Sequence, residues 1–78
     1  MITSTSNKIY KHTKSLYTKK YRYKYNEFII EGYKLFNEAK RSNLNIKQII
    51  LREGEDFIDG CVYLDSKTFN SLSEMNNP

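Results

Sequence analysis

Tyrosines alternate with cations in residues 18–27, and this stretch is the part of the chain best suited to binding chemistry. Lysine and arginine displace condensed counterions from nucleic acid, and an arginine can grip a phosphate through two parallel hydrogen bonds. Tyrosine rings offer flat faces on which unpaired bases stack, which is how many proteins recognise RNA loops. In an extended segment the tyrosines would face one way and the cations the other. The predicted RNA-binding residues are Lys11, Lys14, Lys19, Lys20, Arg22, Lys24, Tyr23 and Tyr25.

The charge of the chain is concentrated near its start. Residues 1–27 contain seven basic residues and one acidic residue, whereas residues 28–78 contain six basic and eight acidic residues. The two parts therefore carry net charges of +6 and −2, and the whole chain carries +4. Such an asymmetry indicates a polyanionic partner. We expect the lysines and Arg22 to hold phosphates, and Tyr23 or Tyr25 to stack on a base.

Some of the neighbouring residues have structural interpretations instead. Three tyrosines outside the stretch are expected to pack in the core: Tyr10, Tyr17 and Tyr33. Arg22 could hold a phosphate or form an ion pair with Glu31, and the sequence leaves both interpretations open. His12 lies among lysines, with no carboxylate close in sequence, and is interpreted as a surface or RNA-facing ring rather than a catalyst.

Catalytic and metal-binding groups are scarce. The chain has one cysteine, Cys61, and one histidine, so the sequence predicts neither a zinc site nor an internal disulfide. The three glycines form no phosphate-binding motif, and we expect this chain alone not to be an enzyme. The single cysteine, the polar N-terminus and the lack of any long apolar run favour a cytoplasmic protein without a membrane partner.

The elements that must position these residues follow an α/β pattern. Phe28–Ile30 is a continuous apolar run, which predicts a strand covered on both faces. The period then changes to that of a helix with one buried face over residues 32–42. At the junction, Glu31 would cap this helix, and Gly32 would allow a tight turn from strand to helix.

The other elements come before and after this unit. A helix is predicted from Asn7, which with Ser6 is a candidate for its cap. Strands are predicted at residues 46–51 and 61–64, and the intervening helix makes the first of them parallel to the strand before it. Residues 65–66 would then cap a final helix.

One small domain over residues 1–78 is therefore expected, with three helices and three strands in an incomplete, mostly parallel sheet. The spacing Arg22…Phe28-x-x-Glu31-Gly32, followed by an amphipathic helix containing Ala39, resembles the N-terminal substrate-binding domain of SpoU (TrmH-type) RNA 2′-O-ribose methyltransferases. The resemblance covers essentially the whole chain. It implies a three-layer α/β/α sandwich like that of the ribosomal proteins that bind kinked RNA.

The resemblance also implies features outside this chain. In that family a separate knotted domain follows, binds S-adenosylmethionine and performs the chemistry, so we expect no cofactor in this chain. Family dimers usually form through the knotted domain, so a homodimer is expected only for an intact parent protein. Residues 52–60 depart from the family pattern because they are few for a crossover helix.

The leading hypothesis is an RNA-binding, substrate-recognition domain of an S-adenosylmethionine-dependent RNA 2′-O-ribose methyltransferase, with rRNA favoured over tRNA. Two alternatives stay open. One is a free-standing RNA-binding protein of the ribosomal kind, and the other is a basic module that binds an acidic protein or surface.

Overall fold

Four helices and a two-stranded sheet make up residues 1–72, the part of the chain that the computed structural model describes. The elements are α1 (Lys8–Ser15), α2 (Lys19–Tyr25), α3 (Tyr33–Arg41), β1 (Ile49–Arg52), β2 (Cys61–Leu64) and α4 (Ser66–Ser71). The predicted α/β class is confirmed. Residues 73–78, which the predicted domain includes, lie outside the described part.

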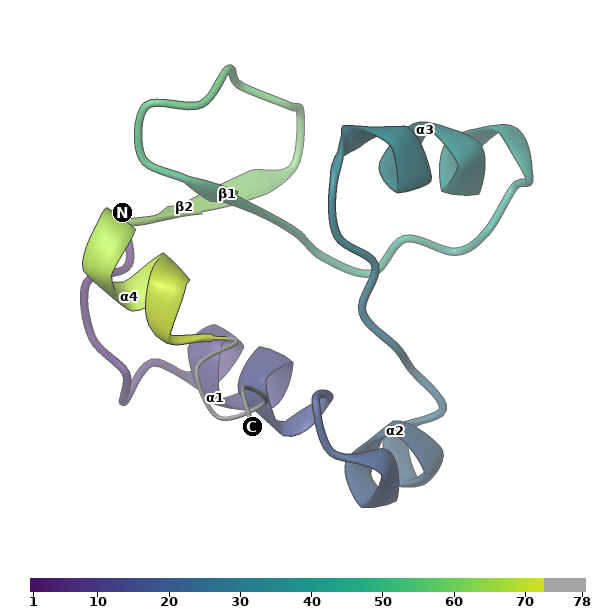
Figure 1. Cartoon of the computed structure of the whole chain (residues 1–78), viewed down its shortest axis with the longest axis horizontal. Helices are drawn as coiled ribbons and strands as arrows, with labels where there is room; N and C mark the ends of the chain where they lie inside the picture. Colours follow the sequence, from purple (N-terminus) through teal and green to yellow (C-terminus); the bar gives the residue numbers. More distant parts are fainter. Residues whose placement is uncertain (73–78) are drawn as a thin grey trace.

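The two strands run parallel, and Ile49 is opposite Cys61 in their register. The connection between them, residues 53–60, turns at Gly54 and Gly60, whose φ angles of 91° and 83° are readily adopted only by glycine. The start of the chain lies along the other side of β2, because Ile2 forms a single parallel bridge with Leu64. The first residues are therefore tied to the sheet (Figure 1).

The strand predicted at Phe28–Ile30 is wrong. These residues have no strand partner among the described residues, and the side chain of Phe28 is 66% exposed. An apolar run forms a strand only where a neighbouring strand accepts its backbone hydrogen bonds. Here the segment links α2 to α3, and Ile29 lines a pocket with Leu16, Tyr17 and Arg22 at the junction of α1 and α2.

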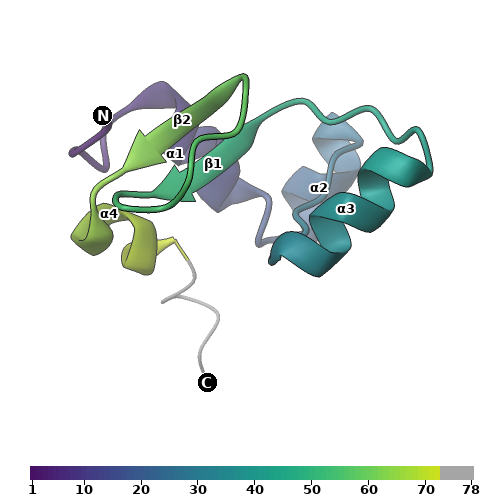
Figure 2. The same cartoon turned by 90° about the horizontal axis from the view of Figure 1, so that it is seen from above.

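The core is small and lies between the sheet, α1 and α4. Its buried centre consists of Tyr10, Leu64 and Leu72, and Leu64 is fully buried. The hydroxyl of Tyr10 and the Oγ of Ser71 are 2.5 Å apart, which joins α1 to α4. Both helices lie on the same side of the sheet in Figure 1, and Figure 2 shows them with the sheet at one end of the molecule, with α2 and α3 at the other. The described residues form no third layer, and the three-layer sandwich stays a prediction.

Two of the three predicted helix caps are present in the structure. Asn7 caps α1 by accepting hydrogen bonds from the backbone N–H groups of its first turn, and Asp65 caps α4 in the same way at 2.9 Å, as predicted. The capping role predicted for Glu31 is wrong, since Gly32 is the N-cap residue of α3 and no side chain caps this helix. Gly32 has a φ angle of 93°, which supplies the turn into α3 without a Cβ clash.

Candidate nucleic-acid interface

The tyrosine-and-lysine stretch forms a helix, α2, and the extended conformation considered from the sequence is wrong. Side chains three and four positions apart therefore meet, and those two apart do not. The ammonium of Lys19 lies 5.4 Å from the ring centre of Tyr23. On another side of the helix, the rings of Tyr21 and Tyr25 stack with their centres 6.2 Å apart. The tyrosines are thus divided between two sides of α2.

The ends of α2 explain why the helix is short. Asn26 ends it in the left-handed conformation, with φ of 54°, which an asparagine tolerates better than most residues. At its start, Thr18 makes no side-chain cap, and Lys19 and Lys20 place two positive charges at the positive end of the helix dipole. A helix of 7 residues with these features needs tertiary contacts to form.

Those tertiary contacts are made with α1. Arg22 Nη1 donates a hydrogen bond of 3.1 Å to the carbonyl oxygen of Leu16, at the end of α1. His12 Nε2 donates one of 2.6 Å to Glu27 Oε1, and the His12 ring packs edge-on against Tyr25 at 4.7 Å. The hydrogen bond from His12 holds the pKa of the Glu27 carboxyl below its ordinary value. Helix α2 is therefore fastened to α1 at its middle, through Arg22, and at its C-terminal end, through Tyr25 and Glu27.

The His12–Glu27 pair was not expected, because the two residues are 15 positions apart. The one available signal was that Glu27 is the only carboxylate in residues 1–27. Lys47 also lies 3.8 Å from Glu27, so this carboxylate serves two cations. The described residues contain only these two ion pairs, and neither involves a lysine of α2.

The structure divides the predicted cations into two groups. Four are exposed and free of ion pairs with any described carboxylate: Lys11, Lys19, Lys20 and Lys24. The ammonium of Lys14 is turned inward, where it donates to the Tyr10 hydroxyl and to the backbone carbonyl of Ser71. Arg22 is half-buried, and the ion pair with Glu31 that the sequence allowed is absent from the described residues.

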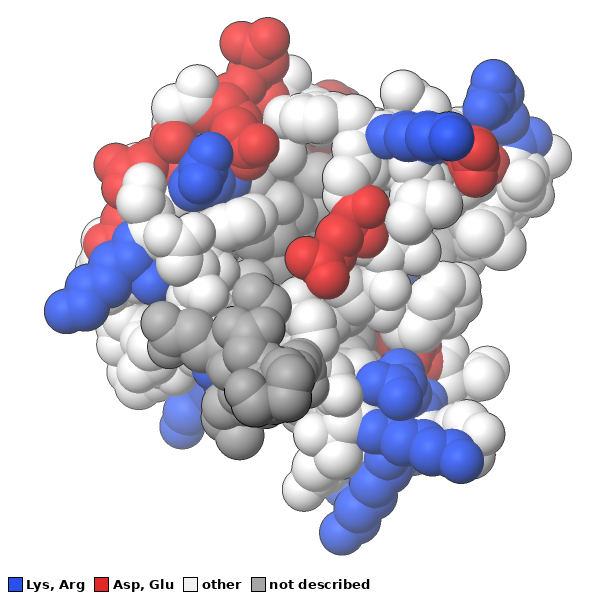
Figure 3. Space-filling view, in the orientation of Figure 1, with Lys and Arg blue, Asp and Glu red and all other residues white. Residues whose placement is uncertain are grey.

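The exposed cations gather on one part of the surface. Figure 3 shows basic side chains clustered where Figure 1 shows α2, and acidic side chains clustered over the loop that joins β1 to β2. The acidic residues of that loop are Glu53, Glu55, Asp56 and Asp59. In the same helix, Tyr23 is 76% exposed and Tyr25 is 41% exposed. We call the exposed surface of Lys11, Lys19, Lys20, Lys24 and Tyr23 the α2 surface.

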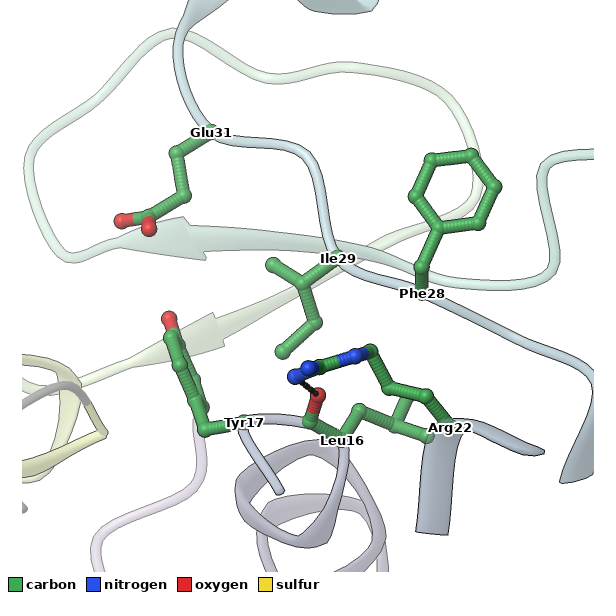
Figure 4. A pocket seen from close by; sticks show the side chains of 6 residues that line it. All are labelled: Leu16, Tyr17, Arg22, Phe28, Ile29 and Glu31. Atoms are coloured by element: carbon green, nitrogen blue, oxygen red, sulfur yellow. Dashed lines mark hydrogen bonds between the residues drawn. The ribbon is translucent and has the colours of Figure 1, made fainter. Parts of the chain in front are cut away.

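Two pockets include residues of α1, α2 or the turn between them. One, of about 390 Å³, lies between α1 and α2, and its lining includes Lys11, Lys14 and the hydroxyl residues Thr5, Ser15 and Thr18. Ammonium and hydroxyl donors of this kind suit a phosphate. The second pocket, of about 360 Å³, is drawn in Figure 4 and is lined by Leu16, Tyr17, Arg22, Phe28, Ile29 and Glu31.

The three tyrosines assigned to the core from the sequence differ from one another. Tyr10 is buried, as predicted, and Tyr17 is half-buried beside the core. Tyr33 is 50% exposed, so the core position predicted for it is wrong. Burial raises the pKa of the Tyr17 hydroxyl, and the negative charge of Glu31 raises it further, which indicates that this carboxylate lies near the ring.

Other kinds of site find little support within residues 1–72. No three acidic, histidine or cysteine side chains of this part of the chain come together as metal ligands. Cys61 is half-buried in β2. No helix there is long and apolar enough to span a bilayer.

Comparison with known proteins relates the sequence of this chain to one family and one relative. The family model for the MRM3-like substrate binding domain matches residues 7–78. The 23S rRNA (guanosine(2553)-2′-O)-methyltransferase RlmP of Bacillus subtilis (strain 168) is 35% identical over 83 residues, which cover 99% of this chain and 34% of that protein. The chain thus spans about a third of the length of this relative. No solved structure matches the chain.

Proposed function

The chain belongs to the MRM3-like substrate-binding domains, and on this basis we propose that it recognises ribosomal RNA for a 2′-O-ribose methyltransferase. The resemblance to the substrate-binding domain of SpoU-type enzymes, predicted from the sequence, is confirmed. The relative's name specifies 23S rRNA as the substrate of that protein, and this favours rRNA over tRNA as the target here.

The observation that carries the RNA-binding part of the proposal is the α2 surface. Four ammonium groups lie there without a carboxylate partner among the described residues, beside an aromatic ring that is 76% exposed. Lysines at the start of α2 oppose the helix dipole, so they weaken the helix that carries them. Their position is explained if they bind phosphates, while Tyr23 stacks on an unpaired base.

The domain would act by positioning its substrate. Binding energy from phosphates and bases distant from the reacting ribose can be used to orient the 2′-hydroxyl toward the methyl donor. That donor, S-adenosylmethionine, would bind elsewhere in the parent protein. The described residues do not fit it, since their glycines lie in three separate turns and form no cradle for a nucleoside.

The proposal also includes the location, oligomeric state and complete fold of the domain. A cytoplasmic location, a homodimer of the intact parent and a three-layer α/β/α sandwich of the ribosomal kind accord with the family, and we retain them as parts of the proposal. Of the two alternatives, a free-standing ribosomal-type protein and a basic protein-interaction module, neither is favoured by the comparisons.

Binding to three polyanions tests the function. The probes are a 23S rRNA hairpin carrying the guanosine named for the relative, a DNA duplex of equal length and anionic lipid vesicles. We expect the tightest binding to the rRNA hairpin, with affinity falling steeply with salt. Lys20→Ala and Lys24→Ala should each lower the salt slope by about 1.

A matched control is available in Lys8→Ala. Lys8 is exposed at the start of α1, the end of that helix distant from α2, and its loss changes the net charge equally. The control should bind the rRNA hairpin like the unchanged chain. Equal affinity for all three polyanions, or an equal loss in the control, would contradict the proposal.

A further inference from the structure

A pocket at the junction of α1, α2 and residues 28–31 combines features that the α2 surface does not have. Its volume of about 360 Å³ lies within the range of small-molecule sites. Figure 4 shows the Tyr17 ring on one side and the Phe28 ring on the other, with Arg22 below and Glu31 above the Tyr17 hydroxyl. Apolar walls and two opposite charges thus line a single opening.

The two charged groups have unused hydrogen-bonding capacity. Arg22 gives one hydrogen bond to the Leu16 carbonyl, out of the five N–H donors of a guanidinium. The carboxylate of Glu31 makes no hydrogen bond or ion pair with any of the described residues. Although both side chains line the pocket, they are too far apart to form an ion pair. A ligand that offers acceptors to Arg22 and donors to Glu31 would satisfy both.

We propose that this pocket binds one unpaired guanine of the RNA. The inference rests on the proposed function, because it assumes an RNA held on the neighbouring α2 surface. Guanine carries two adjacent acceptors, O6 and N7, which an arginine contacts in pairs. Its N1–H and N2–H groups lie on another edge and are two adjacent donors for a carboxylate.

The other bases do not satisfy both groups. Adenine places the N1 acceptor where Glu31 requires a donor, and the pyrimidines have no N7 acceptor for Arg22. Stacking adds to the fit, because Phe28 is 66% exposed and an aromatic ring beside an RNA surface is a favourable platform for a base. The exposed Phe28 and the unpaired charges of Arg22 and Glu31 are thus explained together.

The test uses the 78-residue chain and hairpin RNAs that share one stem and a loop of uridines. One loop position is guanosine, inosine, 7-deazaguanosine or adenosine. Guanosine should bind on the order of tenfold tighter than adenosine. Inosine lacks the N2 amino group and 7-deazaguanosine lacks N7, so each should bind several-fold more weakly than guanosine.

Two variants assign this preference to the pocket. Glu31→Gln should bring the affinities for guanosine and adenosine closer together. The amide has one acceptor oxygen where the carboxylate has two, so it can accept only one of the two N–H groups of guanine. Lys20→Ala should weaken all four RNAs by the same factor and leave the preference intact. Thermal unfolding of each variant checks the fold, and Glu31 is exposed, so its substitution should leave the unfolding temperature unchanged.

The outcomes separate the two proposals. If all four hairpins bind equally well and with steep salt dependence, the guanine pocket is refuted and the RNA-binding function stands. If no hairpin binds, both fail. A guanosine preference that persists in Glu31→Gln would place the recognition elsewhere and would also refute the pocket.

Discussion

Replacing Lys20 with glutamate should separate RNA binding from folding, because the same charge affects the two in opposite directions. Lys20 is exposed in the first turn of α2 and lies four positions before Lys24. A glutamate there would interact favourably with the helix dipole, by about 0.3–1 kcal/mol. It would also replace a repulsion at i, i+4 with an attraction, for a further gain of roughly 0.4–1 kcal/mol. We therefore expect a stabilisation on the order of 1 kcal/mol.

The effect on RNA binding should be a loss. Each phosphate contact contributes about one unit to the dependence of log affinity on log salt, so loss of one contact at 0.1 M salt costs roughly tenfold in affinity. The new negative charge repels the phosphates and adds to this loss. The variant would thus be more stable than the unchanged chain and a weaker RNA binder.

Fluorescence anisotropy with a labelled rRNA hairpin, at several salt concentrations, measures the affinity, and thermal unfolding measures the stability. Lys8→Glu is the matched control, since Lys8 is exposed in the first turn of α1 and outside the α2 surface. That control should gain stability and keep its RNA affinity. An unchanged affinity in Lys20→Glu, or a loss that the control shares, would refute the reasoning.

Three further predictions concern the fold and the stacking surface. The pKa of the Glu27 carboxyl is lowered chiefly by the hydrogen bond from His12, and the pKa of the Asp65 carboxyl by hydrogen bonds from Thr68. Both carboxylates therefore stabilise the fold at pH values above their ordinary pKa values of 4.5 and 3.8. This contribution is lost as pH falls through the lowered values, and unfolding temperatures between pH 6 and pH 2 should show a loss that Glu27→Gln reduces. Tyr23→Ala should weaken RNA binding by about 1–3 kcal/mol through lost stacking, with the unfolding temperature unchanged, and a normal affinity would exclude this ring from the interface. Leu64→Ala should destabilise the fold by about 2–5 kcal/mol in chemical denaturation, because this side chain is fully buried, and a small effect would contradict the assigned core.

The parts of the structure that depend on neighbouring residues were predicted from the sequence. Asn7 and Asp65 cap helices through backbone groups two or three positions away, so the local sequence is enough to identify them. The strand Cys61–Leu64 has the predicted bounds, and the other strand begins at Ile49 rather than at residue 46. The strong charge asymmetry likewise indicated a cationic region near the start of the chain.

The parts that were wrong depend on distant partners. The apolar residues 28–30 favour a strand locally, but no strand of the described residues pairs with them, and Phe28 and Ile29 line a pocket beside the α1–α2 junction instead. The alternating tyrosines are compatible with both a strand and a helix, and the long-range contact between His12 and Glu27 helps to hold the helix. The bridge of Ile2 to Leu64 joins the two ends of the described chain, which no local pattern signals.

The central claim is that RNA lies on the α2 surface, and an NMR titration of the chain with the rRNA hairpin tests it most directly. We expect the largest amide shifts in residues 19–25 and in the adjoining residues 28–31, with little change in the acidic loop of residues 53–60. Shifts centred on that loop, or spread evenly over the chain, would contradict the account.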